Sequence, residues 1–214
     1  MSNKEIRYKR NRGYFIDATR EIIDKEGIEA VTIRKVAKMA GYNSATLYNY
    51  FNNVDHLISI ALSHHIGTYI ETISNMIDEK DSAYDIYCKL WLEYIDESFY
   101  LPKVYYYIFF RNLTVDVSDV YKEYFENHPQ KLKDLPVAVQ KMLTESNAYN
   151  RDLAFLVAEF PHIAEEDLKR MSEMNILIYR SMLYDLQLPG NEDLKEEYIK
   201  RYKNYFNYLT QILR

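Results

Sequence analysis

The sequence predicts an all-α protein in which an N-terminal unit of three short helices precedes a larger helical domain. Glycine and proline occur only five times each in 214 residues, so few positions interrupt helices. Apolar residues recur at i, i+3 and i+4 spacing along most of the chain. Charge is uneven: residues 1–50 hold ten Lys or Arg against six Asp or Glu, a net of +4, and the rest holds 17 against 26, a net of −9.

The first three predicted helices are short and closely spaced. The first covers residues 14–26. Thr32 can cap a second helix over 33–40, which Gly41 ends, and a third helix over 44–50 follows at once. The outward face of the third helix is small and polar, and a helix enters the major groove, about 12 Å wide, only when its leading residues are slim. This pattern predicts a helix-turn-helix.

Basic residues crowd the start of the chain ahead of these helices. Five cations occur within the first dozen residues, and only Glu5 opposes them. Such an arm attracts phosphate because each neutralised phosphate releases counterions; the alternative is a solvated, frayed terminus. The five cations are Lys4, Arg7, Lys9, Arg10 and Arg12.

A long connecting helix is expected over 54–78, where apolar residues keep helical spacing. We therefore divide the chain into a helix-turn-helix DNA-binding domain, 1–53, and a helical domain, 54–214, for which the family resemblance described below implies effector binding and dimerisation. The second domain continues with further helical patterns that are separated by turn-forming residues. These patterns cover 83–99, 103–113, 117–126, 137–145, 148–159, 164–187 and 192–213.

The last two patterns are joined by a short break and predict an antiparallel hairpin over 164–213. Two copies of this hairpin would form a four-helix bundle, which makes a homodimer the expected state. The alternative is that its apolar residues pack inside one protomer. These residues are Leu168, Met171, Ile178, Met182, Tyr198, Tyr202, Tyr205, Leu209 and Ile212.

The run from Ala30 to Phe51 resembles the DNA-binding domain of the tetracycline-repressor (TetR) family. The resemblance covers about residues 10–62, with Thr32, Gly41 and the Leu47-Tyr48 and Tyr50-Phe51 pairs at the family's spacing. It implies a transcription regulator that binds double-stranded, palindromic operator DNA as a homodimer and is released by a ligand. One departure is Val54, which stands where the family usually has a phosphate-binding lysine.

The resemblance also assigns DNA contacts residue by residue. Thr32 would meet phosphate and Arg34 a guanine edge, while hydroxyls of the third helix would hold the backbone. For Tyr48 and Tyr50, packing in the small core is the alternative. Asn52 or Asn53 would replace the contact missing at Val54. The full set of expected contacts is Thr32, Arg34, Asn43, Ser44, Ala45, Thr46, Tyr48, Asn49 and Tyr50.

The resemblance places an effector pocket in the aromatic-rich middle of the chain. The expected effector is small and apolar or aromatic, and a cationic one also fits aromatic rings. Aromatic residues at helical spacing are more often ordinary core, which is the alternative for each position. The residues chosen as ligand contacts are Cys88, Trp91, Tyr94, Tyr107 and Phe110.

Other classes of protein find little support in the sequence. No stretch has the roughly 18 apolar residues that a membrane span requires, and one cysteine and no secretory leader favour a reducing cytoplasm. His56, His64 and His65 lack metal-site spacing. We expect no metal, no cofactor and no enzymatic activity, since no nucleophile motif or phosphate loop stands out. Two alternative interpretations are a helical metabolite-binding protein that has lost DNA binding and a transcription activator with the same DNA-binding domain.

Overall fold

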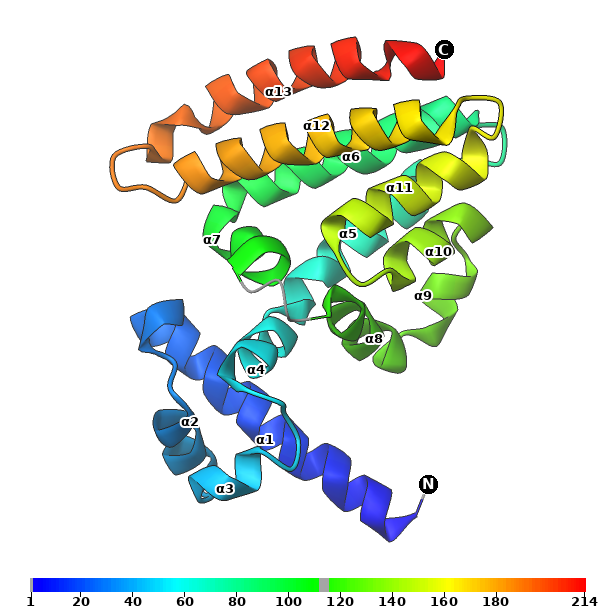
Figure 1. Ribbon diagram of the computed structural model, residues 1–214. Helices are drawn as coiled ribbons and strands as arrows, with labels where there is room; N and C mark the ends of the chain where they lie inside the picture. Colours follow the sequence, from blue (N-terminus) through cyan, green and yellow to red (C-terminus); the bar gives the residue numbers. More distant parts are fainter. Residues whose placement is uncertain (1, 112–115) are drawn as a thin grey trace. The chain divides into compact units, whose positions relative to one another are not determined.

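The computed structural model describes residues 2–111 and 116–214 and confirms the all-α prediction (Figure 1). The protein is 80% helical, and no strand occurs in these two ranges. Residues 112 and 113, the end of the helix predicted over 103–113, lie outside the described residues. The chain forms two compact units, one up to His64 and one from His65 onward.

The first unit contains four α-helices around a small core. Phe15, Ile22, Val36, Leu47 and Leu57 are all buried there. The helix predicted over 33–40 has the observed bounds. The elements are α1 (Asn3–Glu26), the short 3₁₀ turn η1 (Ile28–Ala30), α2 (Ile33–Ala40), α3 (Ser44–Leu47) and α4 (Val54–Ala61).

Helix α1 begins eleven residues earlier than expected, at Asn3 instead of residue 14. The reason is a capping box: the backbone N of Glu5 donates to Oγ of Ser2 at 3.3 Å, and the backbone N of Ser2 donates to the Glu5 carboxylate at 2.6 Å. These bonds satisfy helix N-terminal donors that would otherwise lack partners. The predicted basic arm is therefore the first part of α1.

The connecting helix predicted over 54–78 is interrupted, so that prediction was wrong. Helix α4 ends at Ala61, Leu62 forms a turn, and α5 (Ser63–Met76) follows. The Ala61 carbonyl oxygen accepts a hydrogen bond from Nε of Arg20 at 2.9 Å and lies 3.0 Å from Nδ1 of His64. Side-chain bonds of this kind compete with the backbone ladder and break helices.

Helix α4 also moves the division between the units. It packs against α1, and its residues Leu57 and Ile58 are buried. The division at residues 64 and 65 therefore lies one helix later than the predicted boundary at 53 and 54.

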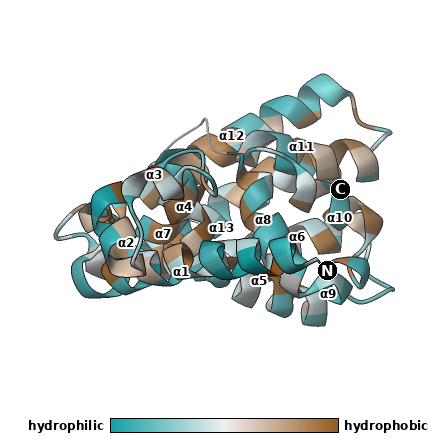
Figure 2. Cartoon of the chain, turned by 90° about the horizontal axis from the view of Figure 1, so that it is seen from below, coloured by the Kyte–Doolittle hydropathy of each residue, from teal (hydrophilic) through white to brown (hydrophobic). Residues whose placement is uncertain are grey.

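In the second unit, α6, α12 and α13 run side by side and α11 packs against α10 and α12 (Figure 1). Most helices carry both hydrophobic and hydrophilic residues, as Figure 2 shows, which is the pattern of helices around a shared core. After α5 the elements are α6 (Ala83–Tyr100), α7 (Pro102–Tyr106), the π-helical turn η2 (Tyr107–Arg111), α8 (Val117–Asn127), α9 (Pro129–Lys133), α10 (Val137–Thr144), α11 (Ala148–Glu159), α12 (Glu165–Asp185), η3 (Glu192–Leu194), α13 (Lys195–Leu209) and η4 (Thr210–Leu213).

The core of the second unit is unusually rich in tyrosine. Tyr87, Tyr105, Tyr121, Tyr179 and Tyr202 are all fully buried. Burial raises the pKa of each of these phenols, so they are neutral hydrogen-bonding groups. Within the described ranges, no helix is long and apolar enough to cross a bilayer, and His, Cys, Asp and Glu form no cluster of three or more suited to a metal.

Candidate functional site

Two helices and a glycine turn form the candidate nucleic-acid interface of the first unit. Thr32 caps α2, and its hydroxyl oxygen accepts a hydrogen bond from the backbone N of Lys35 at 3.3 Å. At the other end Gly41 adopts φ 77° and ψ 26°, the left-handed conformation, while the backbone N of Tyr42 donates to the Ala37 carbonyl at 2.9 Å. Glycine adopts this conformation without a Cβ penalty, so the chain can turn sharply into α3.

Asn43 and Thr46 hold the start of α3 together. The Asn43 side-chain oxygen accepts hydrogen bonds from the backbone N of Thr46 at 2.9 Å and from its hydroxyl at 3.0 Å. Helix α3 is shorter than the predicted 44–50. Residues 48–50 form a turn, in which the N of Tyr50 donates to the Leu47 carbonyl at 3.0 Å.

The outer surface of α2, the turn and α3 is exposed over most of the predicted DNA contacts. Arg34 is exposed on α2, and Tyr48 has 57% of its surface exposed at the end of α3. Leu47 of α3 is fully buried and anchors this helix in the core of the unit. The exposed members of the predicted set are Thr32, Arg34, Asn43, Ala45, Tyr48 and Asn49, and Ser44 and Thr46 are partly buried.

Tyr50 takes a packing role in this unit. Its ring lies 4.9 Å from the Tyr8 ring and 5.6 Å from the Phe15 ring, centre to centre. Its hydroxyl accepts a hydrogen bond from Nδ2 of Asn11 at 3.2 Å. These contacts fit the packing that the sequence left open as the alternative for Tyr50, whose side chain is only partly buried.

Side chains near Val54 differ in how far they are exposed to solvent and in whether they are already hydrogen-bonded. Asn53 caps α4, and its Oδ1 accepts from the backbone N of His56 at 2.8 Å. Asn52 is exposed and Val54 is partly buried. Of the two asparagines proposed to replace the missing lysine, Asn52 is the one whose side chain faces solvent.

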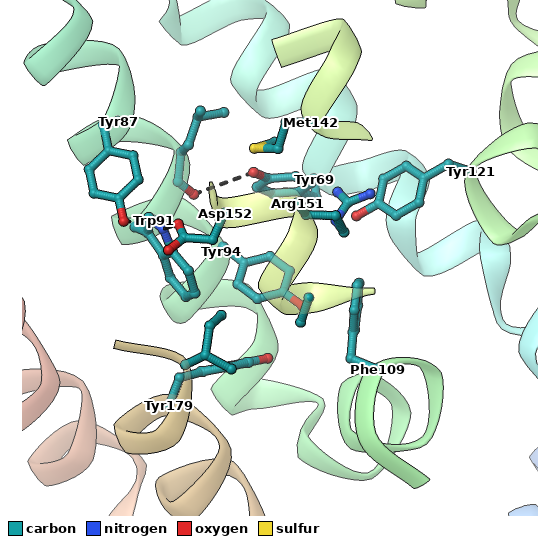
Figure 3. Close-up of a pocket in the computed structure, with 13 residues that line it drawn as sticks. Tyr69, Tyr87, Trp91, Tyr94, Phe109, Tyr121, Met142, Arg151, Asp152 and Tyr179 are labelled. Atoms are coloured by element: carbon teal, nitrogen blue, oxygen red, sulfur yellow. Dashed lines mark hydrogen bonds between the residues drawn. The ribbon is translucent and has the colours of Figure 1, made fainter. Parts of the chain in front are cut away.

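The second unit contains a cavity with an empty volume of about 490 Å³, counting the part that opens to solvent (Figure 3). Most of its walls are aromatic. The lining residues are Tyr69, Tyr87, Leu90, Trp91, Tyr94, Phe109, Tyr121, Met142, Ala148, Arg151, Asp152, Ile176 and Tyr179.

Of the five residues chosen from the sequence as ligand contacts, the cavity wall includes Trp91 and Tyr94. Phe110 is buried and packs against the Tyr179 ring, 5.7 Å centre to centre, and Tyr107 is buried on the same π-helical turn. Cys88 is half-buried near Tyr84, and burial raises the pKa of its thiol. These three are not among the lining residues.

Sequence reasoning missed the charged residues of the cavity. Arg151 and Asp152 follow each other on α11 and are 7% and 3% exposed. Oδ1 of Asp152 accepts hydrogen bonds from the Tyr87 hydroxyl at 2.9 Å and from Nε1 of Trp91 at 2.7 Å. Burial raises the pKa of the Asp152 carboxyl to about 6. An Arg-Asp pair inside an otherwise apolar helical pattern was the available signal.

Comparison with known proteins supports the assignment of the first unit. Residues 15–59 match the profile of a family described as bacterial regulatory proteins, tetR family. The chain is 31% identical over 83 residues to the fatty acid metabolism regulator protein of Bacillus subtilis, covering 39% of this chain and 41% of that protein. It is 26% identical over 85 residues to the HTH-type transcriptional regulator SAB2452 of Staphylococcus aureus, covering 40% and 45%. The matches span less than half of either relative.

Among solved structures, the fold is similar to that of Thermus thermophilus FadR, described as a TetR-family transcriptional repressor in complex with lauroyl-CoA. The TM-score is 0.57 at 15% identity, over 91% of this chain and 92% of that one. At this identity the likeness of the larger helical unit is one of fold alone. Within the chain, it is residues 15–59 that are similar to the TetR family.

Proposed function

We propose that this protein is a ligand-responsive transcriptional regulator without catalytic activity, which acts in the cytoplasm and binds a palindromic operator as a homodimer. The first unit would read DNA, and the cavity of the second unit would bind the effector. The observation that carries the proposal is that α2 and the end of α3 expose Arg34, Tyr48 and Asn49 while Leu47 of α3 is buried.

The contacts to DNA would divide into two kinds. Arg34 can bond two acceptors of a guanine edge at once, and Ala45 and Asn49 would face bases or the adjacent backbone. The hydroxyls of Thr32 and Tyr48 would donate to phosphates and so fix the register of α3 in the groove. Lys35 is paired with Glu26 and is a weaker candidate for a phosphate contact.

The homodimer would use a surface of α12 and α13 that shares Tyr205 and Ile212 with the predicted set but otherwise differs from it. Leu168, Met171, Met182 and Tyr202 are buried within the protomer. Other apolar residues on the same helices are exposed by 44 to 73% and recur at helical spacing, which suits a symmetric four-helix bundle. These are Met174, Leu177 and Tyr184 on α12, Tyr205 and Tyr208 on α13, and Ile212 just beyond it.

The effector would be a small organic molecule whose apolar or aromatic body fills the cavity. An acyl-CoA is a second candidate, because the Bacillus relative is a regulator of fatty acid metabolism and the Thermus FadR structure holds lauroyl-CoA. Trp91 is the only tryptophan and lines the cavity, so its fluorescence would report binding of lauroyl-CoA or any other candidate directly.

Release from DNA would follow if the effector binds more tightly to a conformation in which the two DNA-binding units of the homodimer no longer fit the operator. A coupling free energy of about 1–3 kcal/mol would weaken operator binding roughly 5–150-fold, which is enough for induction. Motion of the chain around Leu62, between α4 and α5, would be the means, because the helix ladder is interrupted there.

The test is anisotropy binding to the DNA upstream of the gene and to selected random DNA, at several salt concentrations. Arg34→Ala is expected to relax sequence preference, with a loss of about 1–3 kcal/mol per bidentate contact. Tyr48→Phe should weaken all sequences alike. Lys133→Ala is the matched control, because Lys133 is an exposed cation on α9, outside the proposed DNA-binding and dimer surfaces.

Specific, salt-sensitive binding that Arg34→Ala disrupts and Lys133→Ala preserves would support the proposal. No specific binding to either DNA pool would contradict it and favour a metabolite-binding protein. For the homodimer, Leu177→Glu should give monomers in sedimentation, while Val137→Glu, an exposed apolar residue on α10, should not. A reporter gene would separate repression from activation.

A further inference from the structure

Two neighbouring residues bring opposite charges into the cavity. Arg151 and Asp152 are both buried on α11, and within residues 2–111 and 116–214 no ion pair joins them to each other or to another residue. Consecutive residues of an α-helix point about 100° apart. In Figure 3 the Asp152 carboxyl accordingly lies beside Tyr87 and Trp91, and the Arg151 guanidinium lies beside Tyr121.

The acidic end of the cavity is only partly satisfied. Oδ1 of Asp152 accepts the two hydrogen bonds from Tyr87 and Trp91, whereas Oδ2 is buried and has no hydrogen-bond partner in the described chain. The Ser172 hydroxyl lies near the carboxyl and lowers its pKa, but it is not a hydrogen-bond partner of Oδ2. Buried carboxylates are normally paired or fully hydrogen-bonded. One acceptor therefore remains open.

The basic end has neutral partners. The Arg151 guanidinium carbon lies 3.9 Å from the centre of the Tyr121 ring and 5.9 Å from that of Phe109. Nη1 donates to the Leu143 carbonyl at 3.0 Å. A guanidinium has five N–H donors arranged to hold an anionic group with two parallel bonds. These contacts hold the Arg151 guanidinium against the Tyr121 ring, and within the described residues no carboxylate pairs with its positive charge.

Aromatic rings line the space between the two ends. Tyr69, Tyr94 and Tyr179 belong to the wall, and the Tyr94 ring lies 5.4 Å from both the Tyr69 and the Tyr179 rings, centre to centre. A purely apolar ligand would fill this middle section but would leave both charges desolvated and unpaired, which is costly. A ligand with one polar group would satisfy one end only.

Resting on the proposed effector role of the cavity, we infer that the effector is bipolar. A positively charged amino group would bind Oδ2 of Asp152, an anionic group such as a carboxylate would bind Arg151, and an aromatic or apolar middle would lie against Tyr94. The two residues would thus set the ligand class of the regulator.

Matched aryl compounds test this inference. Benzylamine carries the cation only, benzoate the anion only, and para-(aminoalkyl)benzoates of increasing alkyl length carry both. Binding would be followed by Trp91 fluorescence and calorimetry on the full chain. We expect the best bifunctional compound to bind at least about ten-fold tighter than either single-group compound, since one charge-assisted hydrogen bond supplies that factor.

Variants of Asp152 and Arg151 should show separately which ligand group binds at each end of the cavity. Asp152→Asn is expected to weaken amine-bearing compounds about ten-fold and leave benzoate unchanged, and Arg151→Met should do the reverse. Asp96→Asn is the matched control, because Asp96 pairs with Lys203 outside the cavity. The inference is wrong if benzoate and the bifunctional compounds bind with equal affinity. It is also wrong if Asp152→Asn leaves the affinities of the amine-bearing compounds unchanged, or if no bifunctional compound binds.

A second measurement needs no ligand. If Asp152 serves a ligand, ligand-free Asp152→Asn should unfold at the same or a higher urea concentration than the wild type. A lower midpoint would make the carboxylate a structural centre and would overturn the inference. Operator binding of the ligand-free wild type is measured in parallel: its absence refutes the proposed function alone, because the affinities of the aryl compounds are read without DNA.

Discussion

Nε of Arg20 donates a hydrogen bond to the carbonyl oxygen of Ala61 at 2.9 Å, and so joins the middle of α1 to the last residue of α4. A cation at a helix C-terminus interacts favourably with the helix dipole as well as with the free carbonyl. The bond lies within the first unit and is only partly exposed. It stabilises the end of α4 immediately before the turn at Leu62.

Replacing Arg20 with Met should destabilise the first unit by about 1 kcal/mol, less than the roughly 1.5–3 kcal/mol of a buried hydrogen bond with a charged partner, because the site is partly exposed to solvent. Hydrogen exchange of α1 and α4 amides measures the change, since Trp91 reports only the second unit. Arg170→Met is the control and should leave exchange in these helices unchanged. Equal protection in Arg20→Met and the wild type would contradict the prediction.

Gly41→Ala should destabilise the turn between α2 and α3. A Cβ would meet no atom within 4 Å, so the cost is conformational: the left-handed region is about 1–2 kcal/mol less favourable for alanine. The expected result is a loss of this size in the free energy of unfolding, with weaker DNA binding as α3 shifts. Circular dichroism in urea gives the first quantity, and an unchanged midpoint would show that the turn relaxes without cost.

Gly67→Ala should destabilise the second unit although alanine is the better helix former. The new Cβ would lie 2.7 Å from Cε2 and 3.2 Å from Cδ2 of Tyr124. That ring stacks on His128 at 4.5 Å and is 9% exposed, so it has little room to move. Overpacking costs about 1–3 kcal/mol, against about 1 kcal/mol gained in helix propensity.

Gly13→Ala is the matched control for this variant, because Gly13 lies inside α1 and its Cβ would meet nothing within 4 Å. It should raise stability by about 0.4–1 kcal/mol. Adding Tyr124→Leu to Gly67→Ala should restore part of the lost stability. If the two glycine variants behave alike in thermal unfolding, close packing at Gly67 is not the cause.

The stability of the wild type should depend on pH through Asp152. Burial raises the carboxyl pKa from 3.8 to about 6, so the folded state binds this proton more tightly than the unfolded state. The favourable contribution is therefore present in full below about pH 3.8 and is lost as the pH rises through 6. At neutral pH the charged form costs on the order of 3 kcal/mol. Tyr87 and Tyr202, which face this carboxyl, remain neutral over this range.

Asp152→Asn does not titrate, so its stability relative to the wild type should increase between about pH 4 and pH 7. Urea unfolding followed by Trp91 fluorescence at each pH measures the difference, and Asp96→Asn corrects for the substitution itself. A difference that stays flat across this range would show that Asp152 keeps an ordinary pKa in the folded protein.

Local signals explain why several helices were predicted with their observed bounds. Helix α2 is defined by the Thr32 cap and by Gly41, and α11 by the Asn147 cap, whose Oδ1 accepts from the backbone N of Asn150 at 2.9 Å. All of these bonds span three to five residues, so the sequence pattern contains them. The capping box of Ser2 and Glu5 is equally local, but it was hidden within a basic run that favoured a solvated terminus.

The cavity could not be predicted in this way, because its contacts join distant residues. Asp152 meets Tyr87 across 65 positions and Trp91 across 61 positions. The chain holds 22 tyrosines and nine phenylalanines at similar helical spacing, and periodicity does not distinguish those that face a cavity from those that face core. The sequence alone therefore selected Trp91 and Tyr94 together with Cys88, Tyr107 and Phe110, which lie elsewhere.

The interruption at Leu62 has a consequence for folding cooperativity. An unbroken helix over 54–78 would share one ladder of amide bonds between the two units, so opening either would fray the other. With the ladder divided, each unit has its own set of amides and its own core, and sub-global opening of one need not expose the other. The amide hydrogens of the first unit can thus exchange with solvent, or that unit can unfold, on a timescale of its own while the aromatic core around Trp91 stays protected.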